Sequence, residues 1–366
     1  MNDTFSLLIT GGAGFIGTHA ARRFAKRGWK VTVLDDFSRA GTELNLAWLR
    51  QECSKLSLEK CDVRDRAAVE SVFHRQRFSG VLHLASQVAV TTSVAAPLDD
   101  FETNACGTFY ILDAVRRHCP DAVFIFASTN KVYGQLEGYA VEQREGRYAY
   151  RDLRDGVDER ASLDFHSPYG CSKGAGDQYV IDFARIYGLR STSFRQSCIY
   201  GERQFGVEDQ GWVAWFAIAA ILGRPLTIFG DGRQVRDLLH VDDLVAAYEL
   251  GFEHPEAISG QAFNLGGGPA NTLSLLELIA LLEGILRRRL AFRTADCRPG
   301  DQKVFVSNVA KASQRLGWAP TVSCEDGVQR LVSWVNANRA MLEKHFYDHP
   351  AKPPVLRGPD LISVRD

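Results

Sequence analysis

The chain has 366 residues, with 43 Lys and Arg against 44 Asp and Glu, so its formal net charge is −1. No acidic tail or basic stripe stands out along it, which makes nucleic acid and anionic membranes poor partner candidates. No apolar run reaches the roughly 18 residues that span a bilayer, and the N-terminus lacks the regions of a signal peptide, so we expect a cytoplasmic protein.

Eight cysteines are spread over the chain, and no two of them form a C-x-x-C pair. No histidine spacing accompanies them that would indicate zinc. The sequence therefore predicts reduced thiols in a cytosolic protein, and no metal site.

Short apolar runs alternate with longer amphipathic segments through the first half of the chain. Between the runs, apolar residues recur at helical spacing, as in Phe15, Ile16, Ala20 and Phe24. This alternation is typical of a parallel sheet wound with helices, so we predict an α/β fold with a Rossmann-type doubly wound parallel sheet. The predicted strands cover residues 5–10, 30–34, 56–60, 80–85, 122–128 and 191–197.

The pattern changes in the second half of the chain. Residues 134–164 are rich in Gly, Arg, Glu and Tyr without a clear period, which indicates either an ordered insertion over the site or a surface loop with no role. Helices are predicted over 212–222, from about 241, over 273–286 and over 324–345, with a short strand over 226–229.

These signals divide the chain into two lobes and a tail. An NAD-binding Rossmann domain is predicted over 1–197 plus about 238–265, and a smaller α/β substrate lobe over 198–237 and 266–346. Residues 347–366 lose the helical period and contain four prolines, which predicts an extended tail.

A glycine-rich turn follows the first predicted strand and opens a helix, with Gly11, Gly14 and Gly17 at three-residue spacing. Glycine at these positions permits a tight turn, close approach of the backbone to a pyrophosphate and close packing of helix on strand. Asp35 ends the second strand, about 20 residues further on, where a carboxylate accepts the ribose hydroxyls and disfavours a 2′-phosphate. The pattern predicts NAD rather than NADP, although Arg39 could hold such a phosphate.

The third predicted strand also ends close to this turn. Asp62 and Val63 follow it and are candidates to contact the adenine. The alternative role for Asp62 is to cap the helix that starts near Asp65.

The Gly-x-x-Gly-x-x-Gly spacing resembles that of the extended short-chain dehydrogenase/reductases, which include the NAD-dependent epimerases and dehydratases. Segments 83–87, 103–108 and 298–301 agree, and the resemblance runs from about residue 5 to about residue 345. It implies tightly held NAD, and a homodimer or homotetramer paired through helices around 101–118 and 169–187. The cofactor-binding residues that it adds to those argued above are Phe15, Ile16, Leu84, Ala85, Gln87 and Asn104.

Tyr169 and Lys173 stand four residues apart in a segment that Pro168 marks as the first turn of a helix. On one helix face the phenol and the ammonium can share a site, and the ammonium and the positive nicotinamide favour the phenolate over a phenol of pKa near 10. The family's register implies that Thr129, after the strand over 122–128, supplies a hydroxyl to the reacting oxygen. We therefore predict Thr129, Tyr169 and Lys173 as catalytic residues, with Tyr169 and Lys173 also touching the cofactor.

The two residues after the threonine indicate the reaction class. Family members that dehydrate nucleotide sugars carry an Asp-Glu pair there, whereas this chain has Asn130 and Lys131. Without carboxyl groups at these positions elimination lacks its proton-transfer partners, so oxidation followed by re-reduction, which is epimerisation, is the simpler use of the site. For Lys131, a structural ion pair is as plausible as a substrate contact.

Four blocks of sequence narrow the resemblance to the CDP-sugar 2-epimerases of this family: 128–134, 164–174, 209–213 and 234–237. The resemblance implies a nucleotide-sugar substrate that is oxidised at C2 to a keto sugar and reduced again on the opposite face. The alternatives are a UDP-sugar 4-epimerase and, from another class, a dinucleotide-sensing protein without catalysis. The intact Tyr169 and Lys173 argue against the latter.

Four arginines are candidates to bind the diphosphate, because guanidinium groups bind phosphate bidentately. The family pattern favours Arg236 and Arg298, with Arg203 as a further candidate. For Arg195 a structural role is the alternative.

Two further positions bear on the sugar pocket. Cys198 stands where many relatives have Asn, and a thiol is the weaker hydrogen bonder. His166 could line the pocket or merely precede the helix that starts near Pro168. The predicted substrate-binding residues are Asn130, Lys131, His166, Cys198, Arg203, Gln210, Arg236, Arg298 and Asp301.

Overall fold

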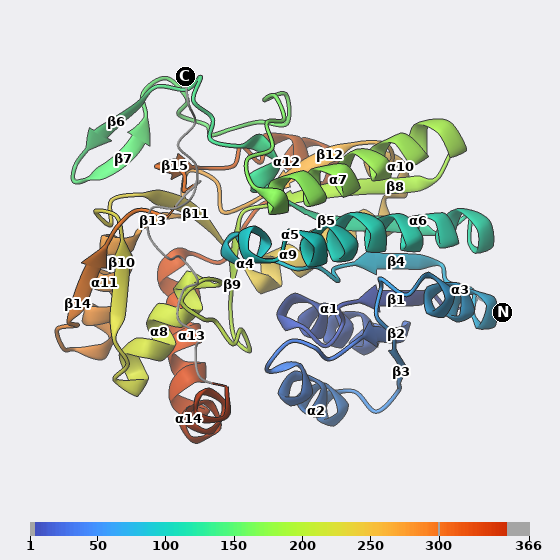
Figure 1. The fold of residues 1–366 in the computed structure, drawn as a ribbon, viewed down its shortest axis with the longest axis horizontal. Helices are drawn as coiled ribbons and strands as arrows, with labels where there is room; N and C mark the ends of the chain where they lie inside the picture. The colour runs from blue at the N-terminus through green and yellow to red at the C-terminus, as the bar shows by residue number, and fades with distance from the viewer. Residues whose placement is uncertain (1–3, 299–300, 350–366) are drawn as a thin grey trace.

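A parallel sheet of seven strands forms the centre of the computed structural model, which describes residues 4–298 and 301–349 (Figure 1). The strand order is β12-β8-β5-β4-β1-β2-β3. The strands are β1 (Ser6–Thr10), β2 (Lys30–Asp35), β3 (Leu56–Lys60), β4 (Gly80–His83), β5 (Val123–Thr129), β8 (Arg190–Gln196) and β12 (Ala262–Leu265). All six strands predicted for the sheet are present, and the doubly wound α/β fold is confirmed.

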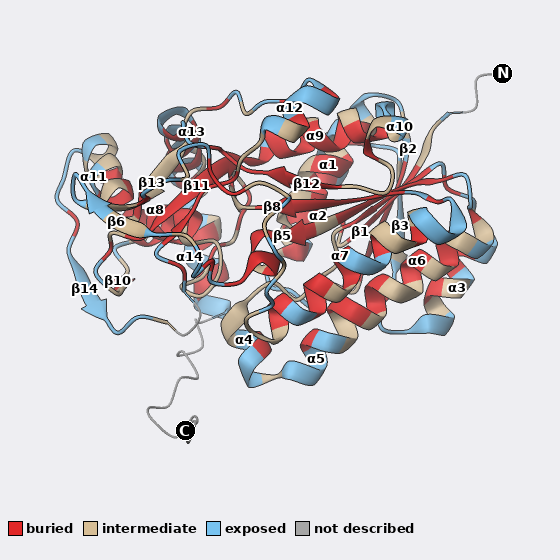
Figure 2. Cartoon of the chain, turned by 90° about the horizontal axis from the view of Figure 1, so that it is seen from above, coloured by how far each residue is buried: buried red, intermediate tan, exposed pale blue. Residues whose placement is uncertain are grey.

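Helices cover both faces of this sheet, and Figure 2 shows the buried strands between them. One face carries α1 (Phe15–Lys26), α2 (Thr42–Glu52), α9 (Val241–Glu253), α10 (Pro255–Ile258) and α12 (Ala310–Leu316). The other carries α3 (Arg66–Arg75), α6 (Gly107–His118) and α7 (Pro168–Tyr187). Three short elements lead into α6: α4 (Val90–Ala95), α5 (Pro97–Phe101) and the π-helix η1 (Glu102–Cys106). The strand order reverses between β1 and β4, which is where such a sheet binds ligands.

A smaller lobe has its own apolar core, centred on the almost completely buried helix α8. Its elements are β9 (Cys198–Tyr200), α8 (Trp212–Leu222), β10 (Leu226–Phe229), β11 (Val235–His240), β13 (Thr272–Ser274), α11 (Leu275–Leu286), β14 (Phe292–Ala295), β15 (Val304–Phe305), α13 (Cys324–Ala337) and α14 (Arg339–Asp348). The predicted helix over 273–286 begins at Leu275 because β13 pairs with β11 and Ser274 caps the helix. The helical stretch over 324–345 is two helices that meet at Asn338.

The insertion over 134–164 is ordered and contains the hairpin of β6 (Val141–Arg144) and β7 (Arg147–Tyr150). Its two ends lie together, because Asp164 N–H donates to the carbonyl of Val132 at 3.0 Å. The Tyr150 hydroxyl donates to the carbonyl of Val304 at 2.8 Å, so the hairpin packs on the smaller lobe. The segment is therefore a packed cover and not a loose surface loop.

One helix lies on the other side of the predicted domain boundary. Helix α12 falls within the range assigned to the smaller lobe, but Ala312, Leu316 and Trp318 pack into the core under the large sheet. Trp318 Nε1 donates to the carbonyl of Asp243 on α9 at 2.9 Å, which anchors this return of the chain. Of the predicted tail, residues 347 and 348 belong to α14, and the prediction for 350–366 lies outside the described residues.

All eight cysteines belong to the described part of the chain, and each has a free thiol. Among the helices of residues 4–298 and 301–349, none combines the length and apolar character needed to cross a bilayer.

Candidate active site

The glycines of the turn between β1 and α1 have different steric surroundings. Gly11 has φ +65°, and a Cβ there would lie 2.8 Å from the Ala85 nitrogen. A Cβ on Gly17 would lie 2.3 Å from the carbonyl oxygen of Gly11, whereas a Cβ on Gly14 would meet only that oxygen, at 3.1 Å. Gly11 and Gly17 are thus needed for packing within the protein, while Gly14 marks the least crowded face of the turn, where a single backbone oxygen lies near.

The first turn of α1 lies directly behind this face. Gly14 is its N-cap and provides no side-chain cap, so the amides of the first turn, which includes Phe15 and Ile16, are free to bind an anion. An uncapped helix N-terminus beside this glycine fits the pyrophosphate of a dinucleotide.

Asp35 ends β2 beside the glycine turn. Its carboxylate accepts hydrogen bonds from the amides of Ala13 at 3.0 Å and Phe37 at 2.9 Å, and burial raises the pKa of this carboxyl. This fixed carboxylate fits an adenosine ribose. Arg39, the candidate phosphate binder, donates instead to the Gln210 side chain of the smaller lobe, so the two predicted site residues meet across the lobes.

Asp62 and Val63 follow β3, as predicted. Asp62 accepts a hydrogen bond from the amide of Arg64 at 2.9 Å and pairs with its guanidinium. The N-cap of α3 is Asp65, which accepts from the amide of Ala68, so the alternative capping role for Asp62 is wrong. The Val63 side chain is buried in the core beneath α3 and α6.

The loop after β4 lies beside the glycine turn, at the point where the strand order reverses. The amides of Leu84 and Ala85 donate to the hydroxyl of Thr10, both at 3.2 Å. The Gln87 amide donates to the side-chain oxygen of Asn104 at 2.9 Å. Asn104 is completely buried in η1, so its side chain holds this loop in place.

A completely buried carboxylate, Asp100, lies behind this loop and was not predicted from the sequence. It accepts hydrogen bonds from Gln87 Nε2 at 3.0 Å, Asn104 Nδ2 at 3.1 Å and the Ser172 hydroxyl at 2.5 Å. Burial raises the pKa of Asp100. The neighbouring Asp99 is largely exposed, and no local pattern distinguishes the two acids.

Thr129, Tyr169 and Lys173 come together at the carboxyl end of β5. Tyr169 and Lys173 lie on the first turns of α7, where Ser167 caps the helix and Pro168 occupies its first turn. Thr129 lies close enough to the phenol to lower its pKa, and Lys173 Nζ donates to the carbonyl of Ala127 at 2.6 Å. The predicted catalytic set therefore shares one site.

Burial dominates the electrostatics of this set. Burial raises the pKa of Tyr169 to about 12, and the nearby Thr129 opposes this shift only in part. Burial lowers the pKa of Lys173 to about 7, against the attraction of Asp177 and Asp100. The tyrosine thus needs added positive charge nearby to act as a base. The lysine exchanges its proton near neutral pH.

A second group of predicted residues gathers around Lys131, on the 3-10 helix η2 (Asn130–Tyr133). Burial, with the nearby Arg236 charge, lowers the pKa of Lys131 to about 8, and Asp301 and Cys198 oppose this shift. Arg236 Nη2 donates to Asp301 at 2.6 Å. Gln302, which was not predicted, accepts from Lys131 Nζ at 3.5 Å.

This group places two cations beside one carboxylate, next to the buried Asn130 that adjoins Thr129. Lys131 makes no ion pair within the distance of a salt bridge among the described residues, which leaves its ammonium available to an anionic or hydroxyl-bearing ligand. The arrangement suits recognition of a phosphorylated sugar.

Two of the candidate arginines have protein partners elsewhere. Arg195 is buried and forms a bidentate pair with Asp177, so its structural alternative is correct. Arg203 stacks on Trp48 at 4.5 Å and donates to the Asn45 side chain at 3.2 Å, so it joins the lobes and is not aimed at the Lys131 group.

His166 and Arg298 also have partners of their own. His166 Nε2 lies 2.8 Å from a carboxylate oxygen of Asp164 at the surface. Arg298 pairs with Asp209 at 2.8 Å and lies over the Phe229 ring at 3.8 Å, in the segment next to Gln210. The structure therefore brings together Asn130, Lys131, Cys198, Arg236 and Asp301. Arg298 pairs with Asp209, the residue before Gln210.

Comparison with known proteins finds a matching family and a relative that is similar along most of its length. The sequence profile described as the NAD dependent epimerase/dehydratase family matches residues 7–266. CDP-paratose 2-epimerase of Salmonella typhi is 44% identical over 336 residues, which are 90% of this chain and 99% of that protein. The similarity to this relative thus covers both lobes.

Solved structures agree. The crystal structure of UDP-glucose 4-epimerase from Thermotoga maritima with UDP-glucose matches with a TM-score of 0.79 at 31% identity, covering 92% of this chain and 100% of that one. The UDP-glucuronic acid 4-epimerase of Bacillus cereus, solved with UDP-glucuronic acid and NAD, matches with a TM-score of 0.78 at 26% identity, covering 91% and 99%.

Proposed function

Because this chain belongs to the NAD dependent epimerase/dehydratase family, we propose that it is a nucleotide-sugar 2-epimerase of the CDP-paratose type. The observation that carries the proposal is the 44% identity to CDP-paratose 2-epimerase along 99% of that protein. In the proposed reaction the C2 carbinol is oxidised to a ketone, and the ketone is reduced again on the opposite face of the sugar.

The region at the β1/β4 reversal fits the cofactor. Gly14 and the uncapped first turn of α1 would hold the pyrophosphate, and Asp35 the adenosine ribose. Bound NAD supplies a hydride acceptor and a positive charge close to the reacting hydroxyl. Asn104 and Asp100 keep the loop of Ala85 and Gln87 in position from behind.

Tyr169 takes the proton from the C2 hydroxyl and later returns it to the reduced oxygen. Thr129, close to the phenol, can bond to the same oxygen. We assign the Lys173 ammonium, held by the carbonyl of Ala127, to favouring the phenolate that this transfer requires, beside the Arg39 charge that already lowers the pKa of Tyr169. Asn130 and Lys131 offer no carboxyl group for proton transfer, which supports epimerisation over loss of water.

The Lys131 group supports binding of the substrate's charged part. We assign Lys131 and Arg236 to the nucleotide-sugar phosphates or the sugar hydroxyls beside them, since both cations lie next to the reacting set. Cys198 lines the same space, and its pKa is raised by burial, so it offers a neutral thiol.

Incubation with CDP-activated hexoses in deuterated water, followed by NMR of the product, tests the reaction. We expect inversion at C2 without solvent deuterium on that carbon, since the hydrogen never exchanges with water. Deuterium at C2 would indicate deprotonation chemistry. Inversion at C4 of a UDP-sugar, with no turnover of CDP-sugars, would identify a 4-epimerase instead.

A variant pair tests the base. Tyr169→Phe removes the phenol oxygen, and we expect kcat to fall by roughly 10² to 10⁴ while bound NAD is retained. Tyr347→Phe, at an exposed position of α14, is the matched control. Unchanged activity in Tyr169→Phe would disprove the catalytic assignment.

We also propose a homodimer paired through α5 and α7. Five large apolar side chains are exposed there: Leu98, Phe101, Tyr179, Ile186 and Tyr187. Ile186→Glu should shift the sedimentation velocity of the protein toward the monomer, while Tyr347→Glu, on the distant α14, should not.

The eight free thiols support a reducing, cytoplasmic location.

A further inference from the structure

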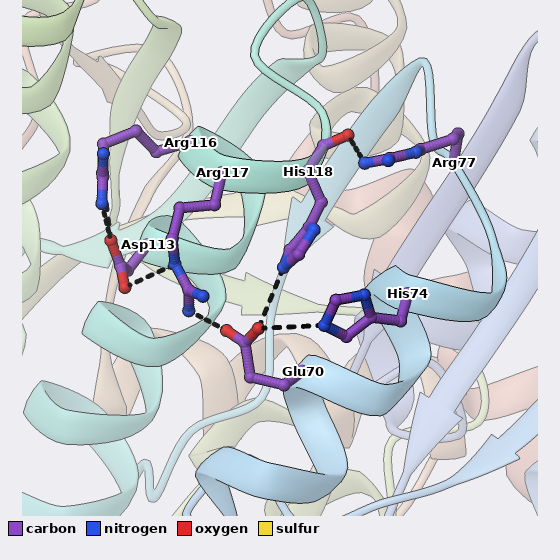
Figure 3. A network of polar contacts seen from close by, with 7 residues as sticks. All are labelled: Glu70, His74, Arg77, Asp113, Arg116, Arg117 and His118. Atoms are coloured by element: carbon purple, nitrogen blue, oxygen red, sulfur yellow. Dashed lines mark hydrogen bonds and ion pairs between the residues drawn. The ribbon is translucent and has the colours of Figure 1, made fainter.

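Three potential metal ligands converge on the outer surface of the first lobe, outside the active site (Figure 3). Glu70 and His74 lie four residues apart on one face of α3, and His118 is the last residue of α6. We propose that Glu70, His74 and His118 bind a divalent transition metal ion, with Zn²⁺ as the preferred ion. Two imidazoles and one carboxylate form a donor set typical of zinc.

The ligand atoms are close to binding geometry. Glu70 Oε2 lies 2.9 Å from His118 Nε2 and 3.9 Å from His74 Nε2, and all three ligand atoms lie within 4.8 Å of one another. Around a tetrahedral zinc ion with bonds of about 2.1 Å, ligand atoms lie about 3.4 Å apart. A small rotation of His74 completes this geometry, and its 67% exposed side chain is free to make it.

The surrounding side chains orient the carboxylate. Arg117 donates to the other oxygen of Glu70, which leaves Oε2 directed at the two histidines. Asp113 accepts from Arg117 Nε at 3.1 Å and offsets its positive charge. Hydrogen bonds of this kind to a ligating carboxylate are a regular part of metal sites.

The position of the site separates it from the reaction. In a doubly wound sheet the helices run antiparallel to the strands, so the C-terminal ends of α3 and α6 lie at the edge opposite the carboxyl ends of the strands. Lys131 follows directly on the carboxyl end of β5, and Tyr169 lies in the first turn of α7 beside Thr129, so both lie at those carboxyl ends. A metal ion here would therefore join two packed helices without entering the chemistry, and its effect should be on stability.

Zinc binding to the full-length chain, freed of metal with a chelator and of any polyhistidine tag, tests the proposal. Competition with a chromogenic zinc chelator gives stoichiometry and affinity, and thermal unfolding with and without Zn²⁺ gives stabilisation. We expect one Zn²⁺ per chain and a raised unfolding temperature. His74→Gln should weaken binding by roughly tenfold or more and abolish the stabilisation.

His254→Gln is the matched control, since His254 is exposed and lies near Glu256 outside this group. His118→Gln should weaken zinc binding as His74→Gln does. Because the His118 ring is only 11% exposed, its loss could disturb folding, so the variant of the exposed His74 is the decisive test. Absence of zinc binding, or equal affinity in the wild type and His74→Gln, would overturn the proposal.

Discussion

The carboxylate of Asp100 accepts a hydrogen bond from the hydroxyl of Ser172 at 2.5 Å, which links α5 to the residue beside Lys173. The other oxygen of Asp100 accepts from the side chains of Gln87 and Asn104. One buried charge thus connects the loop after β4, the π-helix η1 and helix α7, which carries Tyr169 and Lys173.

Removal of this carboxylate should destabilise the protein. Asp100→Ala removes three buried hydrogen bonds to a carboxylate, so we expect the free energy of unfolding to fall by about 3 kcal/mol or more. Asp100→Asn keeps one acceptor oxygen and should lose less. Urea unfolding measures both, with the exposed Asp99→Asn as control. Equal stability of Asp100→Ala and wild type would show that the network is not stabilising.

Two glycine variants should separate folding from cofactor binding. A Cβ on Gly17 collides with the Gly11 carbonyl at 2.3 Å, so Gly17→Ala should be strongly destabilised. Gly14→Ala meets only one atom, at 3.1 Å, and should fold with nearly wild-type stability but bind NAD far more weakly, because the methyl group fills the space for the pyrophosphate. Circular dichroism melting and NAD retention are the measurements. Full NAD retention in Gly14→Ala would contradict the proposed phosphate position.

Lys131→Met should weaken substrate binding. A hydrogen bond to a charged group contributes about 1.5 to 3 kcal/mol, so we expect KM for the nucleotide sugar to rise by roughly 10- to 100-fold. Lys131→Arg keeps the charge and should lose less, and the exposed Lys55→Met is the control. An unchanged KM in steady-state kinetics of Lys131→Met would favour a purely structural role for the lysine.

His83 should make stability depend on acid. Its buried ring is hydrogen bonded to Thr10 at 2.6 Å and Thr108 at 3.0 Å, and burial, aided by the Lys173 charge, lowers its pKa to about 3. Between this value and the unfolded pKa of about 6.5 only the unfolded chain binds the proton. The stabilisation by neutral His83 is therefore complete above pH 6.5 and is lost as the pH falls through that window.

Urea unfolding between pH 7 and pH 4 measures this effect. Over this range we expect the free energy of unfolding of His83→Asn to fall by about 3 kcal/mol less than that of the wild type. The reason is that one proton contributes about 1.4 kcal/mol per pH unit. The exposed His254→Asn should keep the full wild-type slope. Parallel curves for His83→Asn and wild type would mean that His83 titrates normally in the folded protein.

The strands, the glycine turn and the pairing of Tyr169 with Lys173 could be predicted from the sequence because each signal is local. Alternating apolar runs define the strands, and four-residue spacing on a helix brings two side chains to one face. The packing of α12 under the large sheet could not be predicted from a local pattern, because a short amphipathic helix packs equally well on either lobe.

Roles that depend on distant partners could not be predicted in the same way. Arg195, Arg203 and Arg236 are chemically alike, yet the first is neutralised by Asp177, the second is stacked on Trp48 and only the third lies beside Lys131. The same holds for Glu70 and His74, whose partner His118 comes from another helix. Spacing along the chain does not encode such meetings.

The hydroxyls of Thr129 and Tyr169, which we propose as the reacting groups, belong to the large sheet and its helix, whereas Cys198 and Arg236 come from strands β9 and β11 of the other lobe. The proposed proton-transfer groups and the proposed substrate-binding side chains thus come from different lobes. A lineage could change which ring position is inverted by small shifts of β9 and β11 alone, with the proton-transfer groups left untouched. Proteins of this fold that differ in substrate would then differ in the sequence of the strands that hold the sugar, and not in the residues that react with it.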